Sequence, residues 1–552
     1  MELQEVGKYS VEPFALERIL ELEVVKKVNE HARFHVRGVL KEGEQTGMID
    51  QSWEKQPVKL TQDGKTLFGG VVTDLGVICE SGVYYLEADA VSWTIELDRE
   101  EMKRSFQERG RSYQSIANQL AAEAGGTVEY TAPDKMVRNL LLQYRETNWE
   151  FLKRLASHSN SVLVPDAAAE LPSFSFGLAG GSSYGEQTSK ADFSVHKKVA
   201  RYRKLSQCQE VSYQEEDAVE YTVCTDHAAL EIGDQVSIQG NSLYVREVRL
   251  RLKGSVFLCS CTATTKSGIS AAKICHPYIS GVTLDGKVLK AQDDTVKVHL
   301  SIDLSQEEGK AYPFPYATGY SAEGHTGWYV MPEIGDTVQV VFPTEDENDA
   351  YAVQSARQED TEKTADPKVK YLRTPDGKEI KLDGEEILIT AKDGVTYVRI
   401  NEKTGVDIYT DQEVKVISDG NLIVDSGDDI AMTCKNNFSI QAGKNIFVTA
   451  QDVISLTNTG NNLTMVPMAG TSLAAKKAIL VSSGDNIDMA SKGKFIASSR
   501  NAMKLSAAKD LSAQAGKKLA LAASSALEQS CRGSSIKMNG TINMKASLIK
   551  EN

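Results

Sequence analysis

Three segments of the sequence carry residue types that could do chemistry, and each matches a known kind of site incompletely. The acidic run TEDENDA (344–350) offers carboxylates to a cation. It lacks the pattern of a calcium-binding loop, D-x-D/N-x-D/N-G, and the Glu that follows it as a bidentate ligand. The glycine-rich GLAGGSSYG (177–185) has no strand-to-helix phosphate motif around it. The basic HKKVARYRK (196–204) carries a tyrosine and could contact nucleic acid. We expect instead a solvated hairpin, a flexible loop, and an exposed strand or subunit contact.

Histidines and cysteines do not form a recognisable site either. His31 and His35 could be a ligand pair, but their even spacing on a strand more simply means a shared face. The closest of the eight scattered cysteines, Cys259 and Cys261, flank one residue in a strand-like run, which favours free buried thiols over disulfides or a metal cage. No Ser-His-Asp grouping is discernible. We therefore predict no catalytic residue, no metal site and no cofactor, and a protein that is not an enzyme.

Length and composition indicate several domains of a soluble protein. The chain has 552 residues, 41% of them hydrophobic and 25% charged. It begins without a basic and then apolar leader, and nowhere do about 18 apolar residues follow one another. We expect synthesis and assembly in the cytoplasm, before the protein becomes part of an injected or secreted particle.

Charge is distributed unevenly along the chain. Residues 413–552 hold 16 Lys and Arg against 11 Asp and Glu, whereas the other 412 residues hold 46 against 65. An acidic body with a basic far end is not typical of a general nucleic-acid binder, but it would let that end approach an anionic surface.

The most regular feature is an eight-residue repeat, an octad. Six units fill 413–460 and seven fill 478–533; the second position is apolar in all thirteen, and the fourth is apolar in twelve. The sixth position is small in twelve, and the seventh and eighth are usually polar or glycine. Because alternate residues share one face of a strand, each octad predicts a strand with one apolar face and then a corner.

The period excludes the helical alternatives but leaves two β arrangements open. Apolar residues at i, i+2 and i+8 fit neither a 3.6-residue helix nor a heptad. One octad makes a single wall, so either three successive units of one chain wrap a coil or three chains build a common prism. The predicted needle core is Val414, Val416, Leu422, Val424, Ile430, Phe438, Ile440, Ile446, Val448, Ile454, Leu456, Ile487, Phe495, Leu511 and Leu519.

Upstream segments also read as β-structure. Residues 376–410 alternate strands with Asp-Gly and Lys-Thr-Gly turns and predict a β-neck, which a polar stretch at 354–370 precedes. Residues 275–356 hold several short strands with turns and fit a small barrel of oligonucleotide/oligosaccharide-binding (OB) type.

These segments together resemble the VgrG family of spike proteins. GWYVMPEIGDTVQVVFPTEDENDAYAVQSA (327–356) is similar to the family's small barrel, and LLQYRETNWEFLKRLA (141–156) resembles its Gln-Tyr-x-Glu-Thr helix start. In that helix Thr147 and Glu150 have capping-box spacing. LFGGVVTDLGV (67–77) and the segment 230–264 are similar to strands of the family's hub barrels.

The resemblance implies a mainly β homotrimer in four parts: a tail-hub-like domain of β-barrels with minor helices (1–270), the OB-type barrel (275–356), a connector and β-neck (357–412), and a triple-stranded β-helix needle (413–552). It further implies a structural spike of a contractile injection machine. The machine would be a type VI secretion tip, an extracellular contractile particle or a phage tail. The hub would join inner-tube and baseplate proteins to a needle that pierces a target membrane, with no nucleic acid bound. A PAAR-type tip protein or effector would sit at 534–552, where the repeat decays.

Two other classes remain open from the residues. A phage tailspike enzyme would need carboxylates on its β-helix wall, but only five acidic residues follow position 470. An OB-type nucleic-acid-binding protein would need aromatic platforms in a basic groove. Tyr316, Tyr320 and Trp328 are available for that role, but the charge around them is acidic.

Overall fold

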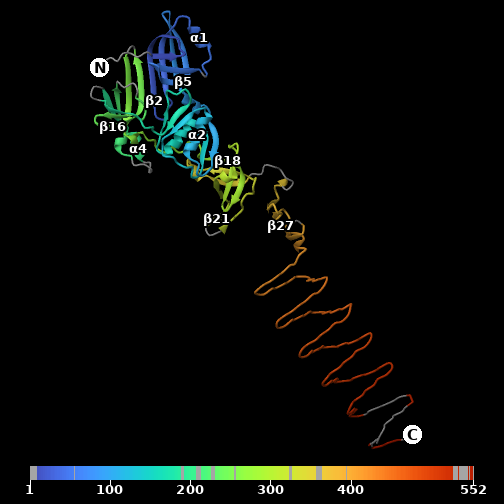
Figure 1. Cartoon of the computed structure of the whole chain (residues 1–552). Helices are drawn as coiled ribbons and strands as arrows, with labels where there is room; N and C mark the ends of the chain where they lie inside the picture. The colour runs from blue at the N-terminus through green and yellow to red at the C-terminus, as the bar shows by residue number, and fades with distance from the viewer. Residues whose placement is uncertain are drawn as a thin grey trace. The chain divides into compact units, whose positions relative to one another are not determined.

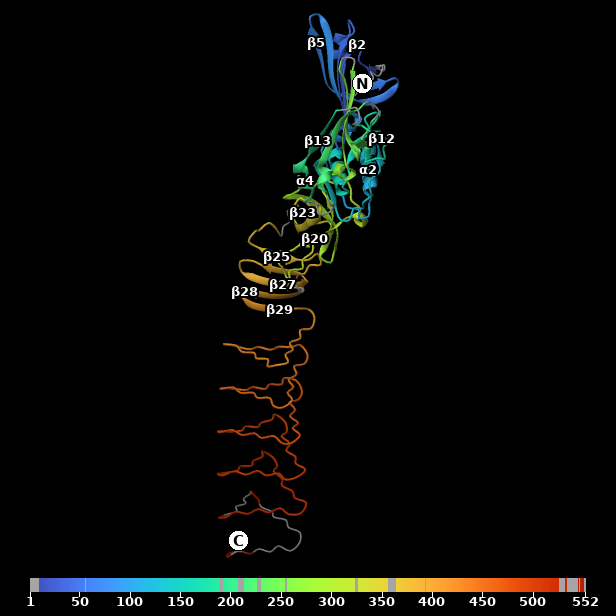
Figure 2. The same cartoon turned by 90° about the vertical axis from the view of Figure 1, so that its left-hand side faces the viewer.

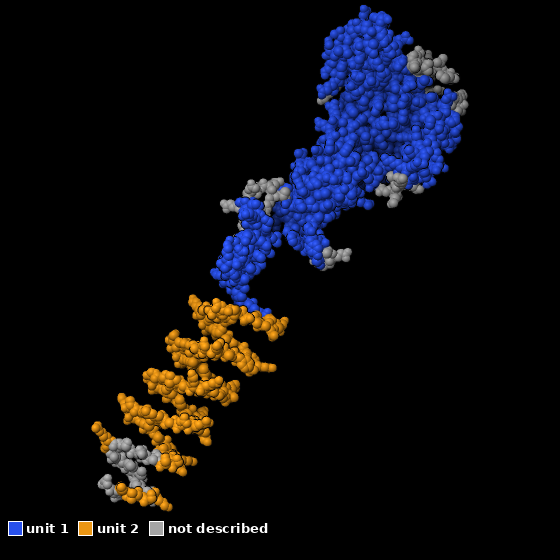
Figure 3. Space-filling view, turned by 180° about the vertical axis from the view of Figure 1, so that it is seen from behind, with its two compact units in different colours: residues 1–417 blue, residues 418–552 orange. Residues whose placement is uncertain are grey.

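A computed structural model gives the fold of the chain. It describes residues 9–54, 56–187, 192–206, 213–225, 230–253, 256–322, 326–355, 364–392, 394–525, 532–533, 545 and 547–550. The chain divides into two compact units, 1–417 and 418–552 (Figure 3). Within the described residues, no helix has the length and apolar character needed to cross a membrane. The structure is mainly β, as predicted.

The N-terminal region, which we call the hub (9–270), is built on one twelve-stranded sheet (Figure 1). Where separate barrels were expected, its two halves are joined, because β2 pairs with both β3 and β16. In spatial order the strands are β1 (Tyr9–Glu12), β4 (Pro57–Gln62), β5 (Lys65–Glu80), β6 (Val83–Ser92), β3 (Arg33–Leu40), β2 (Leu16–Lys27), β16 (Asn241–Lys253), β17 (Val256–Thr264), β14 (Val219–Thr225) and β13 (Phe193–Lys197), while β15 (Gln235–Ile238) joins β16 and β12 (Ser183–Glu186) joins β15.

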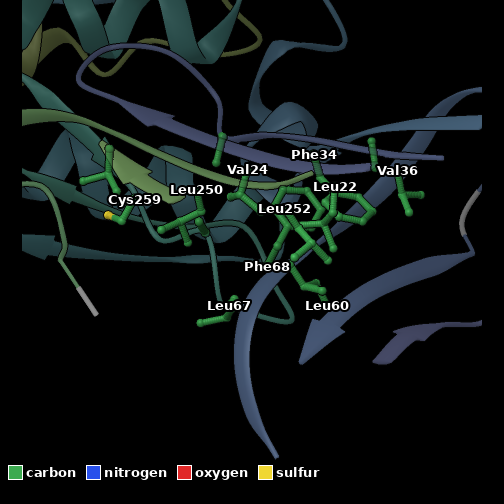
Figure 4. Close-up of a cluster of buried hydrophobic side chains, with 14 of the residues drawn as sticks. Leu22, Val24, Phe34, Val36, Leu60, Leu67, Phe68, Leu250, Leu252 and Cys259 are labelled. Atoms are coloured by element: carbon green, nitrogen blue, oxygen red, sulfur yellow. The ribbon is translucent and has the colours of Figure 1, made fainter. Parts of the chain in front are cut away.

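Tight turns and alternating apolar residues fix the register of this sheet. Asp63 and Gly64 both have positive φ between β4 and β5, the geometry of a two-residue hairpin turn. Phe34 on β3 stacks on Phe68 of β5 with ring centroids 5.2 Å apart, inside the buried cluster drawn in Figure 4. Cys259 and Cys261 are buried and free, as predicted, whereas Cys79, Cys224, Cys275 and Cys434 are free but exposed.

A helical layer with its own core completes the hub. The predicted capping box is confirmed: the Thr147 hydroxyl accepts from the Glu150 N–H at 3.1 Å, and Glu150 accepts from the Thr147 N–H at 3.1 Å. Phe151, Leu152 and Leu155 are fully buried. The elements of the layer are α2 (Tyr113–Glu123), α3 (Asn148–His158), β7 (Met102–Phe106), β8 (Thr127–Tyr130), β9 (Leu141–Glu146), β10 (Leu163–Pro165), β11 (Ser173–Phe176) and η1 (Trp93–Asp98).

Short helices and one small hairpin connect the strands of the hub and of the barrel that follows it. They are α1 (Gln45–Asp50), α4 (Val199–Ser206), α5 (Lys266–Ile269), η2 (Glu215–Ala218), η3 (Glu308–Lys310), η4 (Glu347–Asp349), and the hairpin β21 (Ser321–Ala322) and β22 (Thr326–Gly327).

The predicted small barrel is confirmed. Five strands close on themselves: β18 (Val282–Gln292), β19 (Thr295–Leu300), β20 (Pro313–Ala317), β24 (Tyr351–Ser355) and β23 (Thr337–Phe342), with β23 pairing back to β18. Counted along the chain, the spatial order is 1-2-3-5-4, a Greek-key order that places the last strand between the third and the fourth. Val296, Phe314 and Val340 are fully buried inside it.

Residues 370–409 form the neck, a five-stranded antiparallel meander that Figure 2 shows as successive arrows. Its strands are β25 (Lys370–Arg373), β26 (Glu379–Leu382), β27 (Glu386–Lys392), β28 (Thr396–Asn401) and β29 (Gly405–Tyr409).

The described part of the octad segment up to residue 525 (413–525) is an extended chain with regular bends. Each octad was expected to form a strand, but the described residues after Tyr409 form no strand ladder within one chain. A strand ladder requires a neighbouring strand to accept its hydrogen bonds. The extended segments between bends, which we call arms, do not supply such a neighbour to one another within a single chain.

Candidate functional site

The predicted needle core is not buried by one chain. All fifteen side chains of that set are between 50% and 70% exposed. Three outward-facing apolar residues at the third position are more exposed still, at 81% for Ile423, 86% for Phe447 and 90% for Leu480, whereas Ile496 at 68% is not. In those three octads the two faces differ in the predicted sense. Burial of the inner face remains a prediction about an assembled protein.

The corners fall where the octad frame places them. Bends occur at positions seven and eight of each described octad, from 419–420 to 524–525. In several units the sixth residue accepts a hydrogen bond from the N–H of the eighth, as Ser418 does from Gly420 at 3.2 Å and Ser483 from Asp485 at 3.1 Å. Asn458, the exception to the small sixth position, accepts from Gly460 at 2.8 Å. The sixth residue thus stabilises the corner in these units.

The frame also continues through 461–477, where the sequence shows no strict repeat. Bends lie at 459–461, 468–469 and 476–477, so these 17 residues contain one nine-residue unit and one octad. The extra residue, Asn461, falls in a corner, and Leu463 and Met465 then occupy the second and fourth positions. An insertion at a corner leaves the alternation of the following arm unchanged, which is why the repeat resumes in phase.

Within the first unit, a buried ion cluster joins the hub to the barrel. Arg154 of α3 is 1% exposed and donates to both Glu146 carboxylate oxygens at 2.9 Å. It also donates to Glu347 of the barrel at 2.6 Å and to the Leu142 carbonyl at 2.6 Å. The guanidinium thus has four acceptor contacts on two parts of the fold, the fully satisfied geometry that a buried charge requires.

His276, which lies in the segment between hub and barrel, completes this cluster as a neutral ring. Burial and the neighbouring Arg154 lower its pKa to about 3. Its Nδ1 accepts from the Tyr278 N–H at 3.2 Å, so the ring proton is on Nε2, which lies 3.3 Å from a Glu146 oxygen without a hydrogen bond to it. Burial raises the pKa of Glu146, against the opposing effect of Arg154.

The barrel and the hub also share apolar packing. Leu140 and Leu142 of the hub belong to the same buried cluster as Val298 and Phe342 of the barrel. Nearby, the Asp303 carboxylate accepts from the Ser105 N–H at 2.6 Å. Hub and barrel therefore share one buried core at this junction.

Among the polar residues of 344–350, Glu347 is the exception to the expected solvated hairpin, because Thr344, Glu345, Asn348 and Asp349 are exposed as predicted. Glu347 is 6% exposed and pairs with Arg154, while Asp346 accepts from the Asn348 N–H at 2.9 Å and so shapes the turn. These residues line one wall of an open cleft of about 830 Å³ between hub and barrel. No group of three acidic, His or Cys side chains among the described residues is arranged to hold a metal ion.

The histidine pair makes internal contacts, whereas most of the basic segment 196–204 is exposed, as expected. His31 is hydrogen-bonded to Thr94 at 2.8 Å and Asp98 at 3.1 Å, and His35 to Asp89 at 2.9 Å. The basic segment 196–204 ends β13 and forms most of α4, where Arg201 pairs with Glu220 at 3.2 Å.

The glycine-rich segment and the barrel aromatics complete the expected sites. In 177–185 the Ser182 N–H donates to Asp234 at 2.7 Å, and a Cβ at Gly181 would collide with Asp234, so this stretch packs closely instead of forming a flexible loop. In the barrel, Tyr320 is 54% and Trp328 is 70% exposed.

Comparison with known proteins gives one family and several solved structures. A family model described as "Uncharacterized protein conserved in bacteria (DUF2345)" matches residues 402–547. No curated protein matches the chain. An E. coli protein, described as a component of the type VI secretion system with structural similarity to T4 bacteriophage tail proteins gp27 and gp5, is 14% identical. It covers 63% of this chain and 100% of its own, with a TM-score of 0.47.

Two further solved structures are similar. A chain of the Francisella PdpA-VgrG complex is 8% identical, with 73% of this chain and 80% of that chain covered and a TM-score of 0.45. A 43 kDa tail protein of prophage MuSo2 from Shewanella oneidensis is 10% identical, with 49% and 99% covered and a TM-score of 0.39.

Proposed function

We propose that the chain is a VgrG-type spike: a homotrimer that joins the inner tube and baseplate of a contractile injection machine to a membrane-piercing needle. The observation that carries this proposal is the apolar octad face, which remains at least half exposed in one chain. A soluble protein does not keep so long an apolar stripe in water unless another surface covers it. The function is mechanical, so no catalytic residue is required.

Three chains explain the exposed face better than one coil does. If three successive octads of one chain wrapped around a common axis, their second and fourth residues would face one another and be buried. Instead Ile446 is 54% and Val448 is 69% exposed. Two further copies, each supplying its own apolar walls, would bury these residues and pair the free strand edges.

The family match supports the same proposal independently of the octad geometry. The matched family is a VgrG C-terminal domain, and its 402–547 span covers the last neck strand and the octads. The OB-type nucleic-acid alternative is not favoured, because the charge that flanks the barrel aromatics in the sequence is acidic and would repel phosphate. The tailspike alternative lacks clustered carboxylates on the later octads.

The test of the proposal is stoichiometry. We expect native mass measurement of the full chain to give three times the subunit mass, and the complex to resist dissociation on dilution. A stable monomer at micromolar concentration would mean that a single chain closes its own β-helix, and the trimeric spike would have to be abandoned.

A tip partner at 534–552 is the finer part of the proposal. Most of this segment lies outside the described residues, but Leu548 and Ile549, which are described, are 69% and 54% exposed. A PAAR-type tip protein or an effector would bind there and cover the ends of the three chains.

Co-purification tests this tip. We expect a candidate tip protein to be recovered with the full chain and to be lost, about tenfold or more, with a version ending at Gly533. The trimer itself should persist in both, which separates loss of the tip from loss of the needle. Equal recovery of the candidate would place its binding site elsewhere.

A further inference from the structure

The neck sheet has two faces of opposite character. The strand register aligns one ladder of apolar residues and a second ladder beside it on the same face. The first ladder is Leu372, Ile380, Ile389, Val398 and Ile408; the second is Leu382, Ile387, Ile400 and Val406. Except for Val398, which is half-buried, these side chains are 40% to 66% exposed, so the described residues of one chain leave the face bare.

The opposite face is polar and pairs with itself. Arg373 pairs with Glu379 at 2.8 Å, and Lys381 with Glu386 at 3.2 Å. Tyr397 stacks on Tyr409 with centroids 5.5 Å apart. An antiparallel sheet with one polar and one apolar face normally places the apolar face against another layer. The bare face is therefore the side that a partner covers.

Two further copies of this chain fit that face. Its charged residues lie at its margins, Lys370 opposite Leu382 and Lys392 opposite Thr396, and its centre is apolar. An identical apolar face is complementary to that centre. The octad spacing also extends back into the neck, across a bend at 411–412. Val406 and Ile408 of β29 are followed at even spacing by Val414 and Val416, the first inward pair of the octads. The apolar positions of the neck thus lead in sequence directly into the inner positions of the octads.

The octads alone cannot fix how three chains align. Because their inner positions repeat every eight residues, a chain that slips by one octad still presents apolar residues to its neighbours. The neck does not repeat: its five strands are 4, 4, 7, 6 and 5 residues long. A slip there would expose apolar side chains and bury charged ones.

We propose that the neck is the trimerisation seat that sets the register of the octads: three neck sheets pack by their apolar faces and align the chains before the repeats pair. This inference rests on the trimer of the proposed function. It adds which part of the chain specifies the alignment of that trimer. If the neck aligns the three chains, the ends of their octad segments lie at the same height along the trimer axis.

The chain contains a native reporter of register, Cys434. It occupies the sixth position of its octad, on the predicted inner face, and is exposed and free in one chain. With the chains in register, the three copies of Cys434 meet one another near the axis. After a slip by one octad, a Cys434 would face Ser426 or Ala442 of its neighbour. A short bis-maleimide therefore links two copies only when the register is correct.

The experiment compares the full chain with two neck variants, all tested for Cys434 links. Val406→Asn with Ile408→Asn changes the apolar face of β29, while Asp407→Asn alters the opposite face of the same strand. We expect the double variant to raise the concentration for half-dissociation of the trimer by about 100-fold or more and to lose most links. Asp407→Asn should behave as the unchanged protein. Cys434→Ser serves as the control that identifies the linked species.

Each outcome decides one claim. Both side chains of the double variant are already 64% and 66% exposed in one chain, so the hub should keep its circular dichroism and only assembly should change. An unaltered trimer with unaltered Cys434 links in the double variant would overturn the neck inference while leaving the trimeric spike intact. An unchanged protein that is monomeric would instead overturn the proposed function.

Discussion

Val448→Asp should prevent the full chain from forming a heat-resistant trimer, whereas Thr449→Asp should leave it nearly unchanged. Val448 is the fourth residue of its octad and faces the predicted axis, so the variant would place three carboxylates close together in an apolar interior. A buried unpaired charge costs several kcal/mol per ion even after relaxation, and like charges add to that penalty. Thr449 is the next residue and faces outward, where a carboxylate stays in water.

The measurement is the temperature at which the trimer dissociates, followed by light scattering for both variants at neutral pH. Acidification is a second readout, because protonation of three neighbouring carboxylates removes their repulsion and should partly restore the Val448→Asp trimer. If the two variants dissociate at the same temperature, the octad frame is assigned to the wrong face.

Local patterns in the sequence predicted local structure well. The capping box at Thr147 and the bends at octad corners each depend on residues within a few positions of one another. In such places backbone propensity and the spacing of apolar residues act directly, and tertiary contacts reinforce the choice. The exception at Asn458 was also resolved locally, because its side chain makes the same corner hydrogen bond as serine.

Contacts between distant residues were not predictable in the same way. Arg154 and Glu347 are 193 positions apart, and an acidic run read alone gives no sign that one carboxylate is buried. The pairing of β2 with β16 likewise joins two sequence segments, and so the expected barrels are one continuous sheet. The continuation of the octads across 461–477 was missed in the sequence. One residue inserted at a corner interrupts the eight-residue spacing, but the succession of arms and corners continues.

Arg154→Met should lower the stability of hub and barrel together. The substitution keeps much of the apolar volume but removes the cation that Glu146 and Glu347 share. Removing one partner of a buried ion pair destabilises by about 3–5 kcal/mol, because the remaining charges stay in a medium of low dielectric constant. Lys59→Met is the matched control: its partner Glu170 is exposed, so the control should unfold at nearly the same urea concentration as the unchanged protein.

The pH dependence of the Arg154→Met variant distinguishes lost charge pairing from lost packing. Burial already raises the pKa of Glu146 against the opposing effect of Arg154. Without Arg154 that pKa rises further above the value in the unfolded chain, so the folded state binds protons more readily as the pH falls. The deficit in unfolding free energy should therefore shrink between about pH 7 and pH 5, when each variant is compared with the unchanged protein at the same pH. A deficit that stays constant over this range would mean that Arg154 acts through packing alone.

Hub and barrel should also unfold together, because Leu140 and Leu142 of the hub belong to the barrel core. The fluorescence of both parts should therefore change in a single transition. Two separate transitions would mean that the junction does not couple them.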